Sequence, residues 1–275
     1  MRQRRFLQVD VFGAEPYLGN PVAVVVDGEG LSSEEMQAFA AWTNLAETTF
    51  LLPPTTDEAD YRLRIFTTAT ELPFAGHPTL GSAHAWLSAG GAPARSGRLV
   101  QECGVGLVEL RESEGMWSFA APPLRRYEPP DEQTLARAVA ALDLGAEDVL
   151  AAAWLDNGPP WLALRLRSAD AVLAVRPRYE RFAGLMIGVW AAPGSGGTDV
   201  EVRAFTEAGA EDPVTGSLNA GLALWLRDTG EVHPPYVAAQ GTAIGRAGRV
   251  HVREADGTLW VGGRTTTAIA GTVAL

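Results

Sequence analysis

The chain has 275 residues, of which 47% are hydrophobic and 20% are charged, and its net charge is -11 at pH 7. This length suits one large domain or two of ordinary size. A negative charge of this size repels nucleic acid phosphates and the anionic cytoplasmic leaflet, so we expect neither nucleic acid nor a membrane as a partner. No apolar run approaches the ~20 residues of a membrane helix, and no apolar segment follows the basic residues 1–5 as in a signal peptide. We therefore expect a cytoplasmic protein.

Two residue types limit the possible chemistry. The chain has one cysteine, Cys103, which excludes an internal disulfide, a thiolate zinc cluster and a racemase with two catalytic thiols. All 22 of its Lys and Arg residues are arginine. Without lysine, no lysine Schiff base can form with pyridoxal phosphate or with a carbonyl substrate.

The first half of the chain alternates predicted strands with two predicted helices. Ser32 followed by Glu35 has the spacing of a capping box and predicts a helix that ends near residue 43. A second helix begins near Gly76-His77-Pro78, because proline favours the first turn of a helix. Apolar alternation and β-branched runs predict strands at residues 6–12, 22–26, 46–52, 61–66, 99–110 and 116–119.

The second half repeats this order of elements. The proline pairs 122–123 and 129–130 mark a boundary, and an amphipathic helix is predicted at residues 131–142. We predict domains at residues 1–125 and 126–264, with the tail 265–275 returning to the first domain. The remaining elements are predicted as strands at 161–166, 187–191, 200–205, 236–238, 250–253, 259–261 and 267–275, and helices at 179–185 and after Pro213.

One stretch occurs twice. With Pro78 laid over Pro213, an offset of 135 residues, the stretch 76–87 matches the stretch 211–222 at Pro, Gly-Ser, Ala and Leu. Arg64-Ile65-Phe66-Thr67 also recurs as Arg203-Ala204-Phe205-Thr206, and Gly19-Asn20-Pro21 has a looser counterpart at residues 158–160. Three matches in the same order predict a duplicated unit.

The repeated helices predict how each unit is built. Both are apolar on nearly every side, and such a helix is buried. We therefore expect each half to wrap its sheet around one central helix. His77 and Asp212 should lie at or beside the N-caps, where free N–H groups and the helix dipole favour an anion. If the two helix starts face each other, they form a carboxylate-binding cleft.

Three polar residues are the candidates for chemistry. Glu47 lies between a predicted helix and a predicted strand with apolar neighbours on both sides. A buried carboxyl group there has a raised pKa and can both take and give a proton, whereas a hydrogen-bonded or solvated one is structural. His77 at a helix start is biased toward the neutral form and is catalytic or structural. Asp212 has an ordinary explanation as an N-cap.

The successive motifs resemble those of the PhzF-like phenazine-biosynthesis isomerases. The matching segments are Gly19-Asn20-Pro21, Asn44-Leu45-Ala46-Glu47-Thr48-Thr49-Phe50, Gly76-His77-Pro78-Thr79 and Glu211-Asp212-Pro213-Val214-Thr215-Gly216-Ser217. The resemblance implies the α+β fold of diaminopimelate epimerase and proline racemase. That fold has two pseudo-symmetric domains, each a mostly antiparallel, barrel-like sheet around a central helix, with the active site between them. It also implies a homodimer.

The resemblance also implies roles for single residues. Glu47 would be the proton shuttle with His77 and Asp212 as its partners, and Asn20, Gly76, Gly216 and Ser217 would bind a small carboxylate. The reaction would move a proton between carbon atoms of the substrate by acid–base catalysis, without a metal or an organic cofactor.

Two other functions stay open at this point. The first is an epimerase or racemase of an amino-acid-like substrate that works without thiols, with Glu47 and Asp212 acting from opposite faces. The second is a protein that binds small carboxylates without catalysis.

Overall fold

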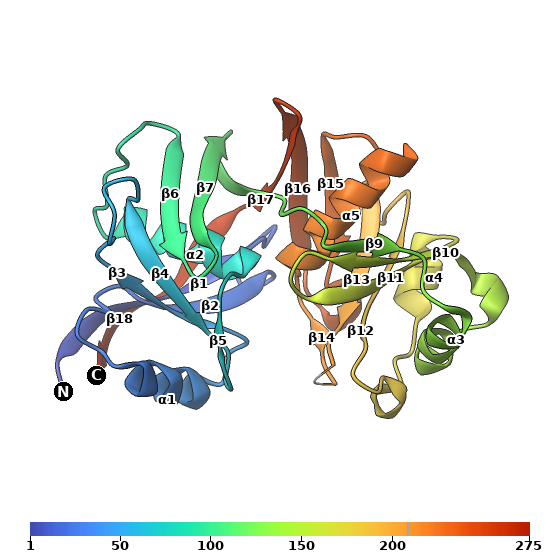
Figure 1. Ribbon diagram of the computed structural model, residues 1–275, viewed down its shortest axis with the longest axis horizontal. Helices are drawn as coiled ribbons and strands as arrows, with labels where there is room; N and C mark the ends of the chain where they lie inside the picture. The colour runs from blue at the N-terminus through green and yellow to red at the C-terminus, as the bar shows by residue number, and fades with distance from the viewer. Residues whose placement is uncertain (208) are drawn as a thin grey trace. The chain divides into compact units, whose positions relative to one another are not determined.

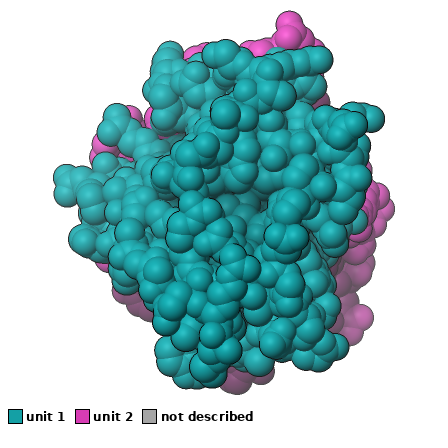
Figure 2. All heavy atoms as spheres, turned by 90° about the vertical axis from the view of Figure 1, so that its left-hand side faces the viewer, with its two compact units in different colours: residues 1–120, 262–275 teal, residues 121–261 magenta. Residues whose placement is uncertain are grey.

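A computed structural model describes residues 1–207 and 209–275 and shows a mixed α+β protein (Figure 1). The chain forms two compact units (Figure 2): unit 1 comprises Met1–Ala120 and Gly262–Leu275, and unit 2 comprises Ala121–Val261. The last strand, β18 (Thr265–Ala274), pairs antiparallel with the first, β1 (Gln3–Val11), so the C-terminal tail is part of unit 1. Within the described residues, no helix is long and apolar enough to cross a membrane.

The sheet of unit 1 is mixed. From β18 the pairing runs through β1, β2, β3, β4, β6 and β7 to β8, and it is parallel only at β2–β3 and β4–β6. The short β5 pairs with β4. The strands are β2 (Asn20–Val25), β3 (Thr48–Leu52), β4 (Tyr61–Phe66), β5 (Glu71–Leu72), β6 (Arg98–Cys103), β7 (Gly106–Ser113) and β8 (Met116–Ala120).

Two helices complete unit 1. Helix α1 (Ser33–Thr43) begins with the predicted capping box, because the Ser32 hydroxyl accepts from the Glu35 N–H and the Glu35 carboxylate accepts from the Ser32 N–H. It ends at Asn44, whose left-handed φ of 57° turns the chain out of the helix. Helix α2 (Gly76–Ser88) packs against strands of unit 1 that include β1, β2 and β18. Every residue of its first two turns is buried, as its composition predicted.

From β10 to β16, unit 2 has the same order of helices and strands and the same kinds of pairing as unit 1 from β1 to β7, and α3 is an additional helix before β10. Its sheet runs β9, β10, β11, β12, β13, β15, β16, with parallel pairs at β11–β12 and β13–β15 and the short β14 on β13. The elements are β9 (Arg126–Glu128), α3 (Glu132–Ala141), β10 (Val149–Asp156), β11 (Pro160–Leu166), α4 (Ala169–Ala174), β12 (Met186–Ala191), β13 (Val200–Phe205), β14 (Glu211–Asp212), α5 (Gly216–Thr229), β15 (Tyr236–Gln240), β16 (Gly248–Ala255) and β17 (Thr258–Gly263).

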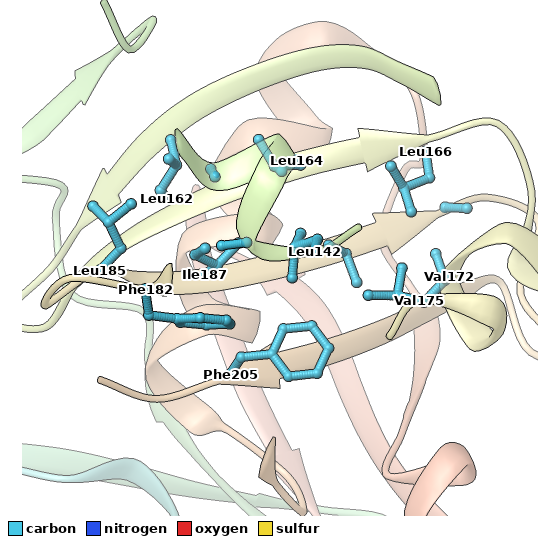
Figure 3. Packing of buried hydrophobic residues seen from close by; sticks show 14 of the residues in the cluster. Leu142, Leu162, Leu164, Leu166, Val172, Val175, Phe182, Leu185, Ile187 and Phe205 are labelled. Atoms are coloured by element: carbon cyan, nitrogen blue, oxygen red, sulfur yellow. The ribbon is translucent and has the colours of Figure 1, made fainter. Parts of the chain in front are cut away.

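A large apolar cluster fills one face of the unit 2 sheet (Figure 3). Phe182 and Phe205 meet edge to face with ring centroids 6.2 Å apart, and Ile187, Leu164 and Leu142 pack around them. Edge-to-face contact adds to the stability gained by removing this area from water. The cluster joins α3 and α4 to the strands β11, β12 and β13.

The structure corrects the register of the internal repeat. The corresponding helices α2 and α5 begin at residues 76 and 216, and the strands β4 and β13 begin at residues 61 and 200. The true offset is therefore 139 to 140 residues, as the Arg-x-Phe-Thr match indicated, and the offset of 135 from overlaid prolines is wrong. Pro78 is the third residue of α2, whereas Pro213 precedes the N-cap of α5 by two residues.

Two predicted elements differ from the observed ones, and one observed strand was not predicted. Residues 99–110 form two strands, because Gly106 with a φ of 102° allows a tight turn between β6 and β7. The helix expected at 179–185 is a single 3-10 turn, Tyr179–Arg181, and the helix of this region is α4. Strand β10 was not predicted, because its alanines carry little strand signal.

The repeated arginines hold equivalent positions in the two units. Arg203 binds Glu211 through Nε and an Nη atom, at 3.0 and 2.8 Å, and its other Nη donates to the carbonyls of Val172 and Val175. Arg64 makes the same two-point contact with Glu71, at 2.7 Å for both bonds. The pairs differ in burial: the exposed fractions are 5% and 6% for Arg203 and Glu211, but 18% and 42% for Arg64 and Glu71.

The repeat thus provides a matched pair of stability variants. Glu211→Gln should lower the free energy of unfolding by about 3–5 kcal/mol, because it leaves the Arg203 charge buried without a counter-charge. Glu71→Gln should cost at most about 1 kcal/mol, because water screens the exposed pair. Denaturant unfolding of both variants measures the difference, and equal losses would contradict this account.

Candidate active site

The parallel pairing of β2 and β3 brings two predicted site residues to one edge of the unit 1 sheet. Ala23 of β2 lies opposite Thr48, the first residue of β3, and the Ala23 N–H donates to the Glu47 carbonyl at 3.4 Å. Parallel strands begin at the same edge, so Asn20 at the start of β2 and Glu47 just before β3 lie on the same side. The site is therefore built where strands of the sheet begin.

His77 reaches this edge from the first turn of α2. It is the second residue of the helix, after Gly76, and its Nε2 lies 3.3 Å from Oε2 of Glu47. The exposed fractions of the two side chains are 7% for His77 and 17% for Glu47. The 3.3 Å distance is within hydrogen-bonding range, but the two atoms approach each other without forming a hydrogen bond. Unit 1 thus brings together a carboxyl group and an imidazole from segments thirty residues apart in the sequence.

Burial keeps the imidazole of His77 neutral. Loss of hydration lowers the pKa of His77 to about 3, and a hydrogen bond to the Pro21 carbonyl only partly opposes this effect. Near pH 7 the ring therefore carries one proton on one of its two nitrogens. With the proton on Nε2 it donates to the Glu47 carboxylate, and with the proton on Nδ1 it accepts from a protonated Glu47. The pair can hold one proton in either arrangement.

Asn20 and Gly76 lie beside His77. The Asn20 side chain is buried, and its Nδ2 is 3.5 Å from Nδ1 of His77, on the side of the ring away from Glu47. Gly76 is buried as the first residue of α2, and no side chain caps the helix at Ala75. The four predicted residues of the first half are therefore gathered in one place.

Asp212 does not take the N-cap position expected for it. It lies in β14, and the N-cap of α5 is Thr215, three residues later. The Thr215 hydroxyl donates to Oδ2 of Asp212 at 2.6 Å, and the buried Gln240 amide donates to the Asp212 carbonyl at 3.0 Å. The expectation failed because the register of the repeat was misjudged: Asp212 corresponds to Leu72 of β5, not to His77.

Gly216 and Ser217 form the start of α5 within unit 2. Gly216 is the buried first residue of the helix, and Ser217 follows it. The Ser217 hydroxyl accepts from the indole N–H of Trp161 at 2.9 Å, and its carbonyl accepts from the Asn157 amide at 2.8 Å. These contacts fix the first turn of α5 on the hairpin of β10 and β11.

The sequence analysis gave no role to the polar core that supports Asp212, although Gln240-Gly241 also fits a later segment of the family resemblance. Gln240 accepts from the Thr215 N–H and from the Asn219 amide, and it donates to the Thr215 hydroxyl. Gln240 and Asn219 are both almost fully buried. One signal in the sequence could have indicated it: Gln240 is a polar amide at the end of an apolar strand. A buried amide requires hydrogen-bond partners, so such a residue predicts a polar cluster around it.

Other chemical groups are less suited to catalysis. Burial raises the pKa of the Cys103 thiol, which lies at the end of β6, so it is not a thiolate near neutral pH. Among residues 1–207 and 209–275, no three His, Cys, Asp or Glu side chains group as metal ligands do.

Comparison with known proteins places this chain in a family. The family model described as "PhzC-PhzF: Phenazine biosynthesis-like protein" matches residues 9–272. The chain is 35% identical over 260 residues to the trans-2,3-dihydro-3-hydroxyanthranilate isomerase of Pseudomonas aeruginosa, with 90% of each chain covered. It is 34% identical over 292 residues to "Antisense-enhancing sequence 1" of Schizosaccharomyces pombe, which covers 98% of this chain and 99% of the relative.

Solved structures agree with the family match. The crystal structure of a phenazine biosynthesis protein of the PhzF family from Enterococcus faecalis superposes with a TM-score of 0.83 at 25% identity, covering 100% of both chains. A hydroxyproline epimerase from Agrobacterium vitis superposes with a TM-score of 0.61 at 14% identity, over 100% of this chain and 93% of that one. The second similarity concerns the fold alone.

Motifs, fold and comparisons therefore agree, and this chain belongs to the PhzC–PhzF phenazine biosynthesis-like family as an isomerase of that family.

Proposed function

We propose that this isomerase moves a proton between two carbon atoms of a small carboxylate, with Glu47 as the acid–base group and no cofactor. The supporting observation is the contact of 3.3 Å between Oε2 of Glu47 and Nε2 of a neutral His77, both mostly buried. A carboxylate can abstract a proton from a carbon atom beside an electron-withdrawing group and return it elsewhere. A neutral imidazole beside it can donate or accept without adding a charge.

The proposed reaction uses one proton carrier on one face of the substrate. Glu47 takes the proton from the first carbon, while the electron pair moves along the conjugated substrate. Glu47 then delivers the proton to the second carbon, and His77 holds the carboxyl group in position by a hydrogen bond throughout. We propose Asp212 as a further acid–base group on the strength of its matching motif.

The substrate class follows from the family and from the helix starts. The relative in Pseudomonas aeruginosa is named for trans-2,3-dihydro-3-hydroxyanthranilate, so a cyclic, aromatic-precursor carboxylate is the first candidate for this chain. We propose that Asn20 with the first-turn N–H groups at Gly76, Gly216 and Ser217 binds the substrate, because helix N-termini favour anions.

Proton transfer by side chains alone is consistent with the residues available. The chain has no lysine for a Schiff base and only one cysteine. The matching topology of units 1 and 2 supports an origin by duplication, with two pseudo-symmetric halves that each wrap a sheet around α2 or α5. We further propose that the protein works as a cytoplasmic homodimer, which mass measurement in solution would test.

Deuterium incorporation tests the role of Glu47. With trans-2,3-dihydro-3-hydroxyanthranilate in D₂O, the wild-type protein should form an isomer that carries solvent deuterium at the new C–H bond, because the partly exposed Glu47 carboxyl group exchanges its proton with solvent before it delivers one to the second carbon. Glu47→Gln should slow this by ~10²–10⁴-fold, the usual loss for a general base. Glu34→Gln removes a fully exposed carboxylate from α1 and is the matched control. NMR spectra of the product measure the exchange.

The same experiment separates the alternatives. Exchange that survives in Glu47→Gln removes this residue from the mechanism. Inversion of an enantiopure amino-acid-like substrate, with no new ultraviolet absorption, would establish an epimerase instead.

The buried His77 predicts a specific dependence of stability on pH. In the unfolded chain a histidine binds a proton below about pH 6.5, whereas the folded His77 does so only near pH 3. Stability should therefore fall as the pH falls through this window, by at most about 1.4 kcal/mol per pH unit from this residue. His77→Gln should lose less stability than the wild type between pH 7 and pH 4.5.

Urea unfolding at several pH values measures this effect. His233→Gln is the control, because His233 is exposed. Identical pH dependence in His77→Gln and the wild type would show that the folded His77 titrates normally.

A further inference from the structure

A buried aspartate near the candidate site has no role in the chemistry proposed above. Asp10 lies in β1 opposite Pro21 of β2 and is 4% exposed. Both of its carboxylate oxygens lie 3.1 Å from the backbone N–H of Gly19. Removing a carboxylate from water costs free energy, and the hydrogen bonds that Asp10 accepts offset part of this cost.

Two glycines close around this carboxylate. A Cβ on Gly13 would lie 2.6 Å from Oδ2 of Asp10, and a Cβ on Gly19 would lie 2.9 Å from Oδ1 and 2.2 Å from the Val11 carbonyl. Neither position accepts a side chain without movement of the backbone. The connection 12–19 between β1 and β2 is therefore folded tightly onto the Asp10 side chain.

The start of the connection is fixed as well. Phe12 is fully buried with a φ of 67°, a conformation that a bulky residue rarely adopts. Its N–H donates to the Arg264 carbonyl at 2.7 Å. Phe12 is held at one end of the connection 12–19 and Gly19 at the other. The residues that follow, Asn20 and Pro21, therefore have a fixed position.

Those following residues contact His77. Asn20, directly after Gly19, places its amide 3.5 Å from Nδ1 of His77. The carbonyl of Pro21, the next residue, hydrogen-bonds the same imidazole. Which ring nitrogen carries the proton is set by the partner of the other nitrogen. The position of Gly19 therefore bears on whether His77 donates to Glu47 or accepts from it.

We propose that Asp10 is a positioning residue for the acid–base pair: by holding the Gly19 N–H, it places Asn20 and the Pro21 carbonyl against His77 and so selects the tautomer that faces Glu47. This inference rests on the proposed role of Glu47 and His77. A carboxylate suits the task because both oxygens share the Gly19 N–H, whereas an amide offers a single acceptor oxygen.

The test observes His77 in the free protein, without a substrate. The chain has four histidines, so ¹⁵N-labelled imidazole signals are few, and His77→Gln identifies the His77 signal. Asp10→Asn should change the ratio of the two His77 tautomers roughly threefold to tenfold, the scale of one neutral hydrogen bond. Asn20→Ala should change it as well, and the effect of the double variant should be smaller than the sum of the two single effects, because Asp10 acts in part through Asn20.

Asp27→Asn is the matched control. Asp27 lies just after the other end of β2, where it pairs with Arg5 of β1, and its loss should leave the His77 signals unchanged. If Asp10→Asn does not fold, Gly13→Ala displaces the same carboxylate and should move the same signals.

Two results would overturn the proposal. One is a His77 spectrum that Asp10→Asn and Gly13→Ala leave unchanged. The other is additive effects of Asp10→Asn and Asn20→Ala, which would show that Asp10 only stabilises the fold. Failure of the deuterium exchange experiment would count against the proposed reaction and leave this spectroscopic result standing.

Discussion

The contact between Glu47 and His77 is the interaction on which the site depends. A carboxyl group and an imidazole are common side-chain groups. What distinguishes these two is that Oε2 of Glu47 and Nε2 of His77 lie 3.3 Å apart in a place that is partly closed to water. Burial lowers the pKa of His77 and keeps its ring neutral near pH 7, so the two side chains do not form a fixed ion pair. The sheet supports this placement because β2 and β3 run parallel and begin at one edge.

The two units share a topology, but the residues of unit 2 that match Glu47 and His77 are different. The segment Leu185–Ile187 leads into β12 as Glu47 leads into β3, and it carries no titratable group. The second residue of α5 is Ser217, where α2 has His77. Other features were kept, such as the two-point contacts of Arg64 and Arg203 with a glutamate. The arginine–glutamate contact is therefore present in both units, whereas the residues at the positions of Glu47 and His77 differ.

Local signals in the sequence predicted much of the fold. The capping box at Ser32 and Glu35, the buried composition of α2 and the alternation in β4 each depend on residues close together in the chain, and each was confirmed. The family motifs also pointed to Glu47 and His77. The prediction was wrong where a local pattern is compatible with several conformations. The alanine-rich β10 was not predicted as a strand, and the glycine turn between β6 and β7 was predicted as part of one strand.

The amino-acid sequence by itself excluded a lysine Schiff base and a pair of catalytic thiols, since the chain has no lysine and one cysteine. It also contained the internal repeat that matches the shared topology of the two units, although overlaid prolines gave the wrong offset. Tertiary structure alone decided that Asp10 holds Gly19, that Gln240 supports Asp212, and that Asn20 lies against His77. The physical reason is that these contacts depend on strand register and on buried hydrogen bonds between distant segments, which no local pattern encodes.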